Sequence, residues 1–257
     1  MNIPRRTLLI AVVPVVAVSC PTSTQPSTTI TQAPVNRSRS GRFPHIVLAD
    51  VPARTAITIT QTSTGTTYGT ANQYESRPAL SLTKLCLADY VLRFGEGTAE
   101  DRDRCEQMVR VSDNVAADEI DDEYPMAIDA IAQEYELSGT ARQGYWGDSV
   151  TTTVDIVRFL ELTRRRDRSS EVLTWMAAAG DVMAEGVPQD FGTVHVRNAH
   201  GTKWGISNDH TIAASASYGC DFSVAAITFG STDEHTADVL DAFPATGCAE
   251  QHVPTAK

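Results

Sequence analysis

The chain has 257 residues, of which 42% are hydrophobic, and this is enough to build a core in one large domain or two small ones. Its formal net charge is −11. Such an excess of carboxylates argues against nucleic acid or an anionic membrane surface as the main partner, because both would repel it.

The first 20 residues have the pattern of a secretory signal. Arg5 and Arg6 precede an apolar run from Leu8 to Val18, which is too short to be a transmembrane helix. Cys20 follows Ala17-Val18-Ser19, which resembles a bacterial lipobox, and this resemblance implies that Cys20 is lipidated and becomes the new N-terminus. A plain secretion signal and an uncleaved anchor stay open as alternatives. We therefore expect an extracytoplasmic protein held at the membrane by an N-terminal lipid anchor.

Residues 21–42 consist mainly of Ser, Thr, Pro and Gln and contain almost nothing to bury. This composition predicts a disordered tether between the lipidation site and a folded domain. The folded domain is predicted over residues 43–248.

The folded domain is predicted to be α+β. Alternating, β-branched sequence indicates strands at 45–50, 56–61 and 66–70. Helical periodicity follows, and strand character returns near the end, giving expected helices at 81–94, 100–110, 114–120, 126–136, 152–165, 170–184 and 233–242 and expected strands at 193–199, 210–217 and 222–229. Strands at both ends with helices between them predict one antiparallel sheet that packs against a helical middle part.

The stretch Ser81-Leu82-Thr83-Lys84 carries the clearest chemical signal. Ser81 begins an apolar-periodic run, so it is expected near a helix N-terminus, where free backbone N–H groups favour developing negative charge. The spacing of three puts the Lys84 ammonium on the same helix face as the Ser81 hydroxyl. A serine is a poor nucleophile until a base takes its proton, and a desolvated lysine can be that base.

A second triplet, Ser112-Asp113-Asn114, adds a hydroxyl that can relay a proton and an amide that can hold a substrate carbonyl or N–H. S-x-x-K followed by S-D-N resembles the signature of class A β-lactamases and penicillin-binding proteins, the penicillin-recognising serine hydrolases. The order of elements and the stretches 149–162 and 186–201 are also similar to that superfamily. The short gap between Ser81 and Ser112 resembles compact actinobacterial cell-envelope relatives.

The resemblance implies a Ser81 acyl-enzyme that forms on D-Ala-D-Ala-type peptides of peptidoglycan or on β-lactams, without a cofactor. Lys84 would be the base, Ser112 the proton relay and Asn114 a substrate ligand. The Ser81 N–H and a strand N–H near residues 199–202 would form the oxyanion hole.

The third motif of the superfamily, K-T-G, is missing from this chain. In the superfamily its lysine supplies positive charge for the substrate carboxylate. Arg197-Asn198-Ala199 is slightly favoured as the replacement because it keeps a cation and a small third residue. His200-Gly201-Thr202 is the second candidate, and Lys203, expected in the following hairpin, is the third.

The glutamate that activates the deacylating water in class A β-lactamases is also not evident. Glu134 is followed by Ser138 where that pattern has asparagine, and it is expected on a solvated helix face. Asp148 is the only carboxylate in the expected loop equivalent, 142–150, and is interpreted as a residue at a helix N-terminus. Efficient β-lactam hydrolysis is therefore not expected.

Apart from Cys20, the chain has four cysteines, an even number that suits an extracytoplasmic domain. Disulfides are predicted between Cys86 and Cys105 and between Cys220 and Cys248, although four cysteines permit three connectivities. The histidines are scattered without metal-ligand spacing, so no metal site is predicted.

Two functions stay open. The intact pair of Ser81 and Lys84 favours a serine hydrolase or acyl-transferase of the cell envelope. The altered third motif and the missing glutamate favour a non-catalytic envelope lipoprotein that uses the same scaffold to bind peptidoglycan or a protein partner.

Overall fold

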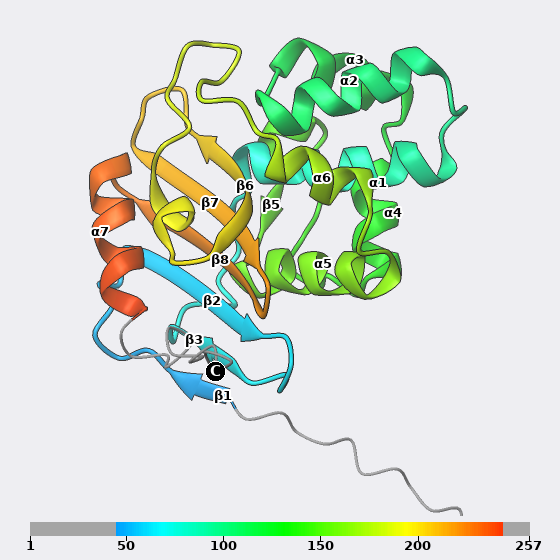
Figure 1. Cartoon of the computed structure of the whole chain (residues 1–257). Helices are drawn as coiled ribbons and strands as arrows, with labels where there is room; N and C mark the ends of the chain where they lie inside the picture. Colours follow the sequence, from blue (N-terminus) through cyan, green and yellow to red (C-terminus); the bar gives the residue numbers. More distant parts are fainter. Residues whose placement is uncertain (1–44, 244–257) are drawn as a thin grey trace, which may run out of the picture. The chain divides into compact units, whose positions relative to one another are not determined.

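A computed structural model describes residues 45–243, which form a six-stranded sheet with helices on both faces (Figure 1). The predicted signal sequence, Cys20, the tether and Cys248 lie outside the described residues. No helix within residues 45–243 has the length and apolar character needed to cross a membrane.

The sheet combines strands from both ends of the domain in the order β1-β3-β2-β8-β7-β6. The strands are β1 (His45–Val47), β2 (Thr55–Gln61), β3 (Thr67–Gly69), β6 (Ala199–Ile206), β7 (Ile212–Gly219) and β8 (Phe222–Phe229). All neighbouring strands are antiparallel except β1 and β3, so the prediction of a wholly antiparallel sheet is wrong at this one edge. Two short strands, β4 (Arg77–Pro78) and β5 (Val150–Thr151), pair separately.

The helical middle part follows the predicted order. Its elements are η1 (Leu80–Thr83), α1 (Lys84–Phe94), α2 (Ala99–Arg110), α3 (Asn114–Glu123), α4 (Ala127–Glu134), η2 (Trp146–Asp148), α5 (Thr153–Arg166) and α6 (Glu171–Ala177). A short η3 (Gly192–His195) precedes β6, and α7 (Thr232–Ala242) ends the described chain. Side-chain caps fix where α2, α3, α5 and α7 begin, and the capping residues are Thr98, Asp113, Thr152 and Ser231.

The sheet carries a core on each face, because successive residues of a strand point to opposite sides. On β8, Ala225 and Ile227 belong to the large apolar cluster that the helical part shares, whereas Val224 and Ala226 belong to a smaller cluster beneath α7. The α+β plan predicted from the sequence is confirmed.

The expected strand at 193–199 is wrong, and the error displaces the following strand. Gly192 has a φ of +68°, and Thr193 is tied down by its N–H, which donates to Ser215 Oγ, and by its hydroxyl, which bonds Ser217 Oγ. These bonds hold the segment over the sheet face as η3 instead of as a strand. The next strand, β6, starts at Ala199 and therefore includes Lys203, which was expected in a hairpin.

The predicted disulfide between Cys86 and Cys105 is absent from the structure. Both side chains are free thiols within the large apolar cluster, Cys86 on α1 and Cys105 on α2. Burial raises the pKa of the Cys105 thiol to about 12 and that of Cys86 further, so both stay protonated and pack as small apolar groups. Cys220 is a free, exposed thiol, and its predicted partner Cys248 is outside the described residues.

Candidate active site

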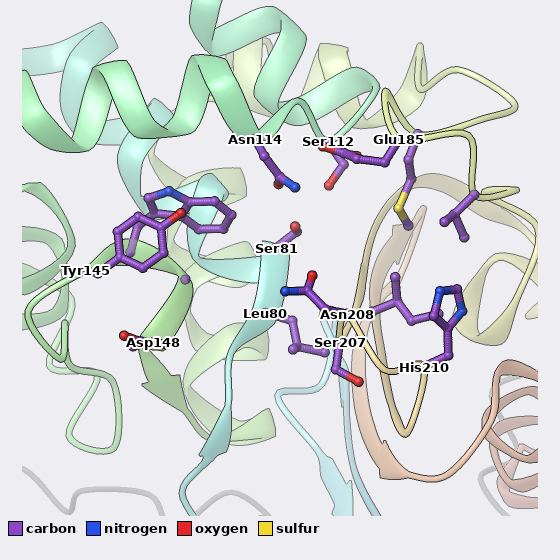
Figure 2. Close-up of a pocket in the computed structure, with 15 residues that line it drawn as sticks. Leu80, Ser81, Ser112, Asn114, Tyr145, Asp148, Glu185, Ser207, Asn208 and His210 are labelled. Carbon is purple, nitrogen blue, oxygen red and sulfur yellow. The ribbon is translucent and has the colours of Figure 1, made fainter.

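A cleft of about 500 Å³ opens between the helical part and the sheet. Its walls come from η1, the connection between α2 and α3, η2, residues 183–187 and the turn between β6 and β7. Figure 2 shows Ser81 directed into this cleft from one segment and Ser112 and Asn114 from another, the turn that leads into α3. The four residues of the two predicted motifs thus come together in one place.

Ser81 occupies the first turn of a helical segment, after a strained residue. Leu80 has a φ of +52°, a conformation that is costly for a branched side chain and that persists only where the surroundings enforce it. Part of that enforcement comes from β6. A Cβ on Gly205 would lie 2.8 Å from Leu80 Cβ and 2.9 Å from the Ser81 backbone nitrogen. The strand can therefore come this close to η1 only because residue 205 is a glycine.

Lys84 is completely buried beneath the cleft. Its Nζ donates to the Ser112 carbonyl at 2.5 Å and to Asn114 Oδ1 at 2.6 Å, and it lies 4.5 Å from the centre of the Trp146 ring. Burial lowers the pKa of Lys84 to about 7, although the negative charges of Glu185 and nearby aspartates oppose this shift. Among the described residues, no hydrogen bond joins Lys84 to the Ser81 hydroxyl.

Ser112 links two lysines. Its φ of +59° turns the chain just before α3, where Asp113 accepts a hydrogen bond from the Ala116 N–H at 3.0 Å and caps the helix. The Ser112 carbonyl accepts from Lys84, and its hydroxyl accepts from Lys203 Nζ at 2.8 Å. The Ser112 hydroxyl therefore connects the cleft with the Lys203 amine, whereas the bond from Lys84 ends on the Ser112 backbone.

Lys203, the least favoured of the three candidates for the missing lysine, is the one that lies beneath the cleft, where it binds the Ser112 hydroxyl. It is completely buried on β6, and its Nζ also donates to the Trp204 carbonyl at 3.0 Å. Burial, and next the charge of Lys84, lower the pKa of Lys203 well below its usual range. If the start of β6 is placed correctly, Lys203-Trp204-Gly205 is the triplet in the sequence that stands where K-T-G is expected.

The two favoured candidates lie elsewhere. Arg197 is exposed between η3 and β6, and His200 is exposed near Cys220, with a distance of 3.6 Å between its Nε2 and the sulfur. His200 and Gly201 line a separate depression beside α6 and no part of the cleft. The prediction that these residues face Ser81 is wrong because β6 begins at Ala199 and reaches Ser81 only at Gly205.

The carboxylates are arranged differently from the class A pattern. Glu134 ends α4, where it forms an ion pair with Arg93 and lines no part of the cleft. Asp148 is the last residue of η2 and lines the cleft, but Figure 2 shows its carboxylate turned away from Ser81. Glu185, which no sequence motif singled out, also lines the cleft, and its side chain extends toward Ser112 in the same view.

The sequence matches no protein-family model and no curated protein. The structure, however, is similar to solved structures. Penicillin-binding protein D2 from Listeria monocytogenes, solved with cefotaxime bound, has a TM-score of 0.58 at 16% identity, over 74% of this chain and 95% of that one.

Two further structures are similar to a comparable degree. A β-lactamase from Burkholderia vietnamiensis has a TM-score of 0.54 at 17% identity, over 74% of this chain and 92% of that one. D-alanyl-D-alanine carboxypeptidase from Mycobacterium tuberculosis has a TM-score of 0.54 at 16% identity, with coverage of 78% and 94%. The predicted resemblance to penicillin-recognising serine hydrolases is thereby confirmed for the fold.

Proposed function

We propose that this protein is a serine hydrolase or acyl-transferase in which Ser81 forms an acyl-enzyme with D-Ala-D-Ala-type peptides or β-lactams. The observation that carries the proposal is the buried Lys84 amine, which lies beneath a nucleophile at the start of a helix and has a pKa of about 7. A lysine is an effective base near neutral pH only when burial lowers its pKa in this way.

The hydrogen bonds of Lys84 favour a basic role. A neutral amine has two N–H bonds and one lone pair, and the two N–H groups are occupied by the Ser112 carbonyl and Asn114 Oδ1. The lone pair is then left for the Ser81 proton. Catalytic hydrogen bonds are often formed only once substrate is bound, so the missing bond between Ser81 and Lys84 is compatible with this role.

The proposed reaction begins when Ser81 Oγ attacks the substrate carbonyl carbon and its proton passes to Lys84. The oxyanion would be stabilised by the Ser81 N–H and by backbone of β6 close to Gly205, which lies against Ser81. The bond to the leaving group breaks as that group takes the hydroxyl proton of Ser112, whose oxygen accepts a hydrogen bond from Lys203. The proton that Lys84 took from Ser81 replaces the one that Ser112 gave up. Water or an amine then attacks the acyl carbon and gives up a proton to Lys84, which returns it to Ser81 Oγ as the acyl group leaves.

The test is the mass of the intact protein after incubation with a fluorescent penicillin and with a peptide thioester. The proposal predicts that the mass increases by one acyl group in the native chain and is unchanged in Ser81→Ala. Ser138→Ala is the matched control because it removes an exposed hydroxyl that lies outside the cleft. An adduct that survives in Ser81→Ala would refute the assignment of the nucleophile.

The second candidate is a non-catalytic envelope protein that binds peptidoglycan or a protein partner. It is favoured by one observation, the absence among the described residues of a hydrogen bond between Ser81 and Lys84. This alternative predicts that the native chain binds muropeptides without any mass increase, even with the activated thioester.

We also propose that Cys20 carries a lipid and that residues 21–42 tether the domain to the membrane. The sequence pattern alone supports this proposal. Metabolic labelling with a fatty acid tests it: incorporation should be lost in Cys20→Ala and retained in Cys220→Ala.

A further inference from the structure

A site that binds a carboxylate needs positively charged side chains, but the charged side chains that line this cleft are acidic. Asp148 and Glu185 are both acidic, and no lysine or arginine of residues 45–243 is part of the lining. His210, on the turn between β6 and β7, is the one other titratable side chain of basic type there. A substrate that enters the cleft therefore meets mainly negative charge.

The two buried lysines do not offset this charge. Lys203 is sealed below the surface and directs its N–H groups at Ser112 Oγ and the Trp204 carbonyl. Lys84 is equally buried and directs its own at the Ser112 carbonyl and Asn114. Burial lowers the pKa of both amines, so neither presents a full positive charge to the cleft near neutral pH.

Trp204, between Lys203 and Gly205, has no free hydrogen-bond donor on its side chain for an anion either. Trp204 is buried in an apolar cluster with Met183 and Phe191, and its indole N–H already donates to the Phe191 carbonyl at 2.9 Å. Met183 of this cluster and Ile206, which packs against it, form an apolar part of the cleft wall. Ser207, Asn208 and His210, on the turn that follows β6, add polar groups to this side of the cleft, but no lysine or arginine.

Glu185 lines the same cleft as Ser81 and Ser112. Its negative charge opposes the fall in the pKa of both Lys84 and Lys203. Figure 2 shows its side chain extending toward Ser112. It is therefore positioned to act on the charge of a bound acyl donor.

We propose that the cleft selects acyl donors that carry a positive charge, and no free carboxylate, close to the scissile carbonyl, and that Glu185 determines this preference. The inference rests on the proposed function and ranks its substrates. Peptides of the D-Ala-D-Ala type and β-lactams still acylate Ser81, but slowly while their carboxylate is free. Peptides with a capped C-terminus and a cationic side chain close to the scissile carbonyl react faster.

The experiment compares three 4-nitrophenyl esters whose acyl chains have equal length and end in a trimethylammonium, a tert-butyl or a carboxylate group. The first two end groups have nearly the same shape, so their rates differ mainly by charge. We expect kcat/KM, after subtraction of the rate with Ser81→Ala, to fall in that order. One charge pair at contact in water corresponds to a factor of about 5 between neighbouring members of the series.

Glu185→Gln should reduce the ratio between the cationic and the neutral ester to about 1, and high salt should reduce it in the native protein. Glu96→Gln is the matched control, because it removes the same charge from an exposed site past the end of α1 and outside the cleft. A carboxylate ester that reacts as fast as the cationic one, or an equal effect of both substitutions, would overturn the inference.

The failure of the proposed function would look different, since no ester would then react in a Ser81-dependent manner. In that case the preference is measured as binding of the three corresponding carboxamides to Ser81→Ala by titration calorimetry. Tighter binding of the cationic amide, weakened by Glu185→Gln, upholds the preference, and equal binding of the three amides overturns it.

Discussion

Lys84 shows how one side chain can be structurally costly and chemically useful. A lysine that is fully buried must either find an anion or lose its proton, and its direct partners here are two neutral oxygens, the Ser112 carbonyl and Asn114 Oδ1. Its pKa therefore falls to about 7. Near neutral pH a substantial fraction is then a free base at the helix start where Ser81 lies.

This environment predicts the pH dependence of acylation. The neutral amine is the reactive form, so the second-order rate constant for acylation of Ser81 should rise as the pH increases through about 7 and level off above it. Lys84→Arg keeps the positive charge but cannot lose its proton, and we expect a loss of about 10²-fold to 10⁴-fold. The measurement is stopped-flow acylation from about pH 5 to about pH 9 with the trimethylammonium ester, whose own charge does not change. A rate that falls over this range would contradict the assignment of Lys84 as the base.

At the scale of elements, the loop before α3 holds both acceptors of Lys84. Asp113 caps α3 while the residues on either side of it bind the amine, so the cap and the site share one turn. Ser231 plays the same capping role on α7, far along the chain and outside the cleft. A comparison of substitutions at Asp113 and Ser231 therefore separates the effect of a lost cap on stability from its effect on the geometry of the site.

We predict that Asp113→Ala and Ser231→Ala each lower the free energy of unfolding by about 1 kcal/mol, because each leaves helix N–H groups without a partner. Only Asp113→Ala should also slow acylation. It should move the midpoint of the pH profile to lower pH as well, since the charge of Asp113 helps to keep the pKa of Lys84 from falling further. Urea unfolding and the pH profile measure the two effects, and a profile that shifts equally in Ser231→Ala would argue against a local role.

The approach of β6 to η1 gives a second prediction at this scale. In Gly205→Ala the new methyl group meets the Leu80 side chain and the Ser81 backbone nitrogen at less than 3 Å, so Ser81 must shift. We expect acylation to fall by about 10²-fold, the usual effect of a displacement of about 1 Å in a reacting group. In Gly230→Ala, the control, the nearest atom is the movable end of the Glu234 side chain. Unchanged kinetics of Gly205→Ala would show that Ser81 does not depend on this contact.

The same strand explains which parts of the site the sequence could predict. Ser81 and Lys84 are neighbours on one helical turn and Ser112 and Asn114 share one loop, so local spacing was enough to identify them. Lys203 depends on the boundary of β6, and the alternating sequence around Thr193 and Val196 indicated a strand six residues too early. Tertiary contacts prevent a strand there, because the hydroxyls of Ser215 and Ser217 on β7 bind Thr193.

Glu185 could not be found from local pattern at all. It lies in an irregular segment between α6 and η3, and its significance comes only from its place in the cleft lining and from the effect of its charge on Lys84 and Lys203 in the folded chain. The disulfide prediction failed for a related reason. An even number of cysteines says nothing about burial, and Cys86 and Cys105 prove to be buried apolar groups on two helices.

At the scale of the whole described domain, the cleft belongs to neither half alone. Ser81 comes from η1, Lys84 from the start of α1 and Lys203 from the sheet. The charge of Glu185 affects both amines from a connecting segment. One apolar cluster joins the halves, since Leu82 and Leu85 next to Ser81 and Lys84 share it with Ala225 and Ile227 of β8. Loss of either half would therefore dismantle the site and open the same core.

This shared core predicts that activity and structure are lost together. In urea, the midpoints measured by far-UV circular dichroism, by tryptophan fluorescence and by Ser81 acylation should coincide, because a single cooperative transition exposes the whole cluster. Leu85→Ala, a truncation at a fully buried position of the cluster, should lower the free energy of unfolding by about 2 to 5 kcal/mol and move all three midpoints equally. Val47→Ala, at a mostly exposed position on the edge strand β1, is the control and should move none of them appreciably. If acylation were lost at a clearly lower urea concentration than the two spectroscopic signals, the cleft would open independently of the core, and the strain at Leu80 would be held by local contacts alone.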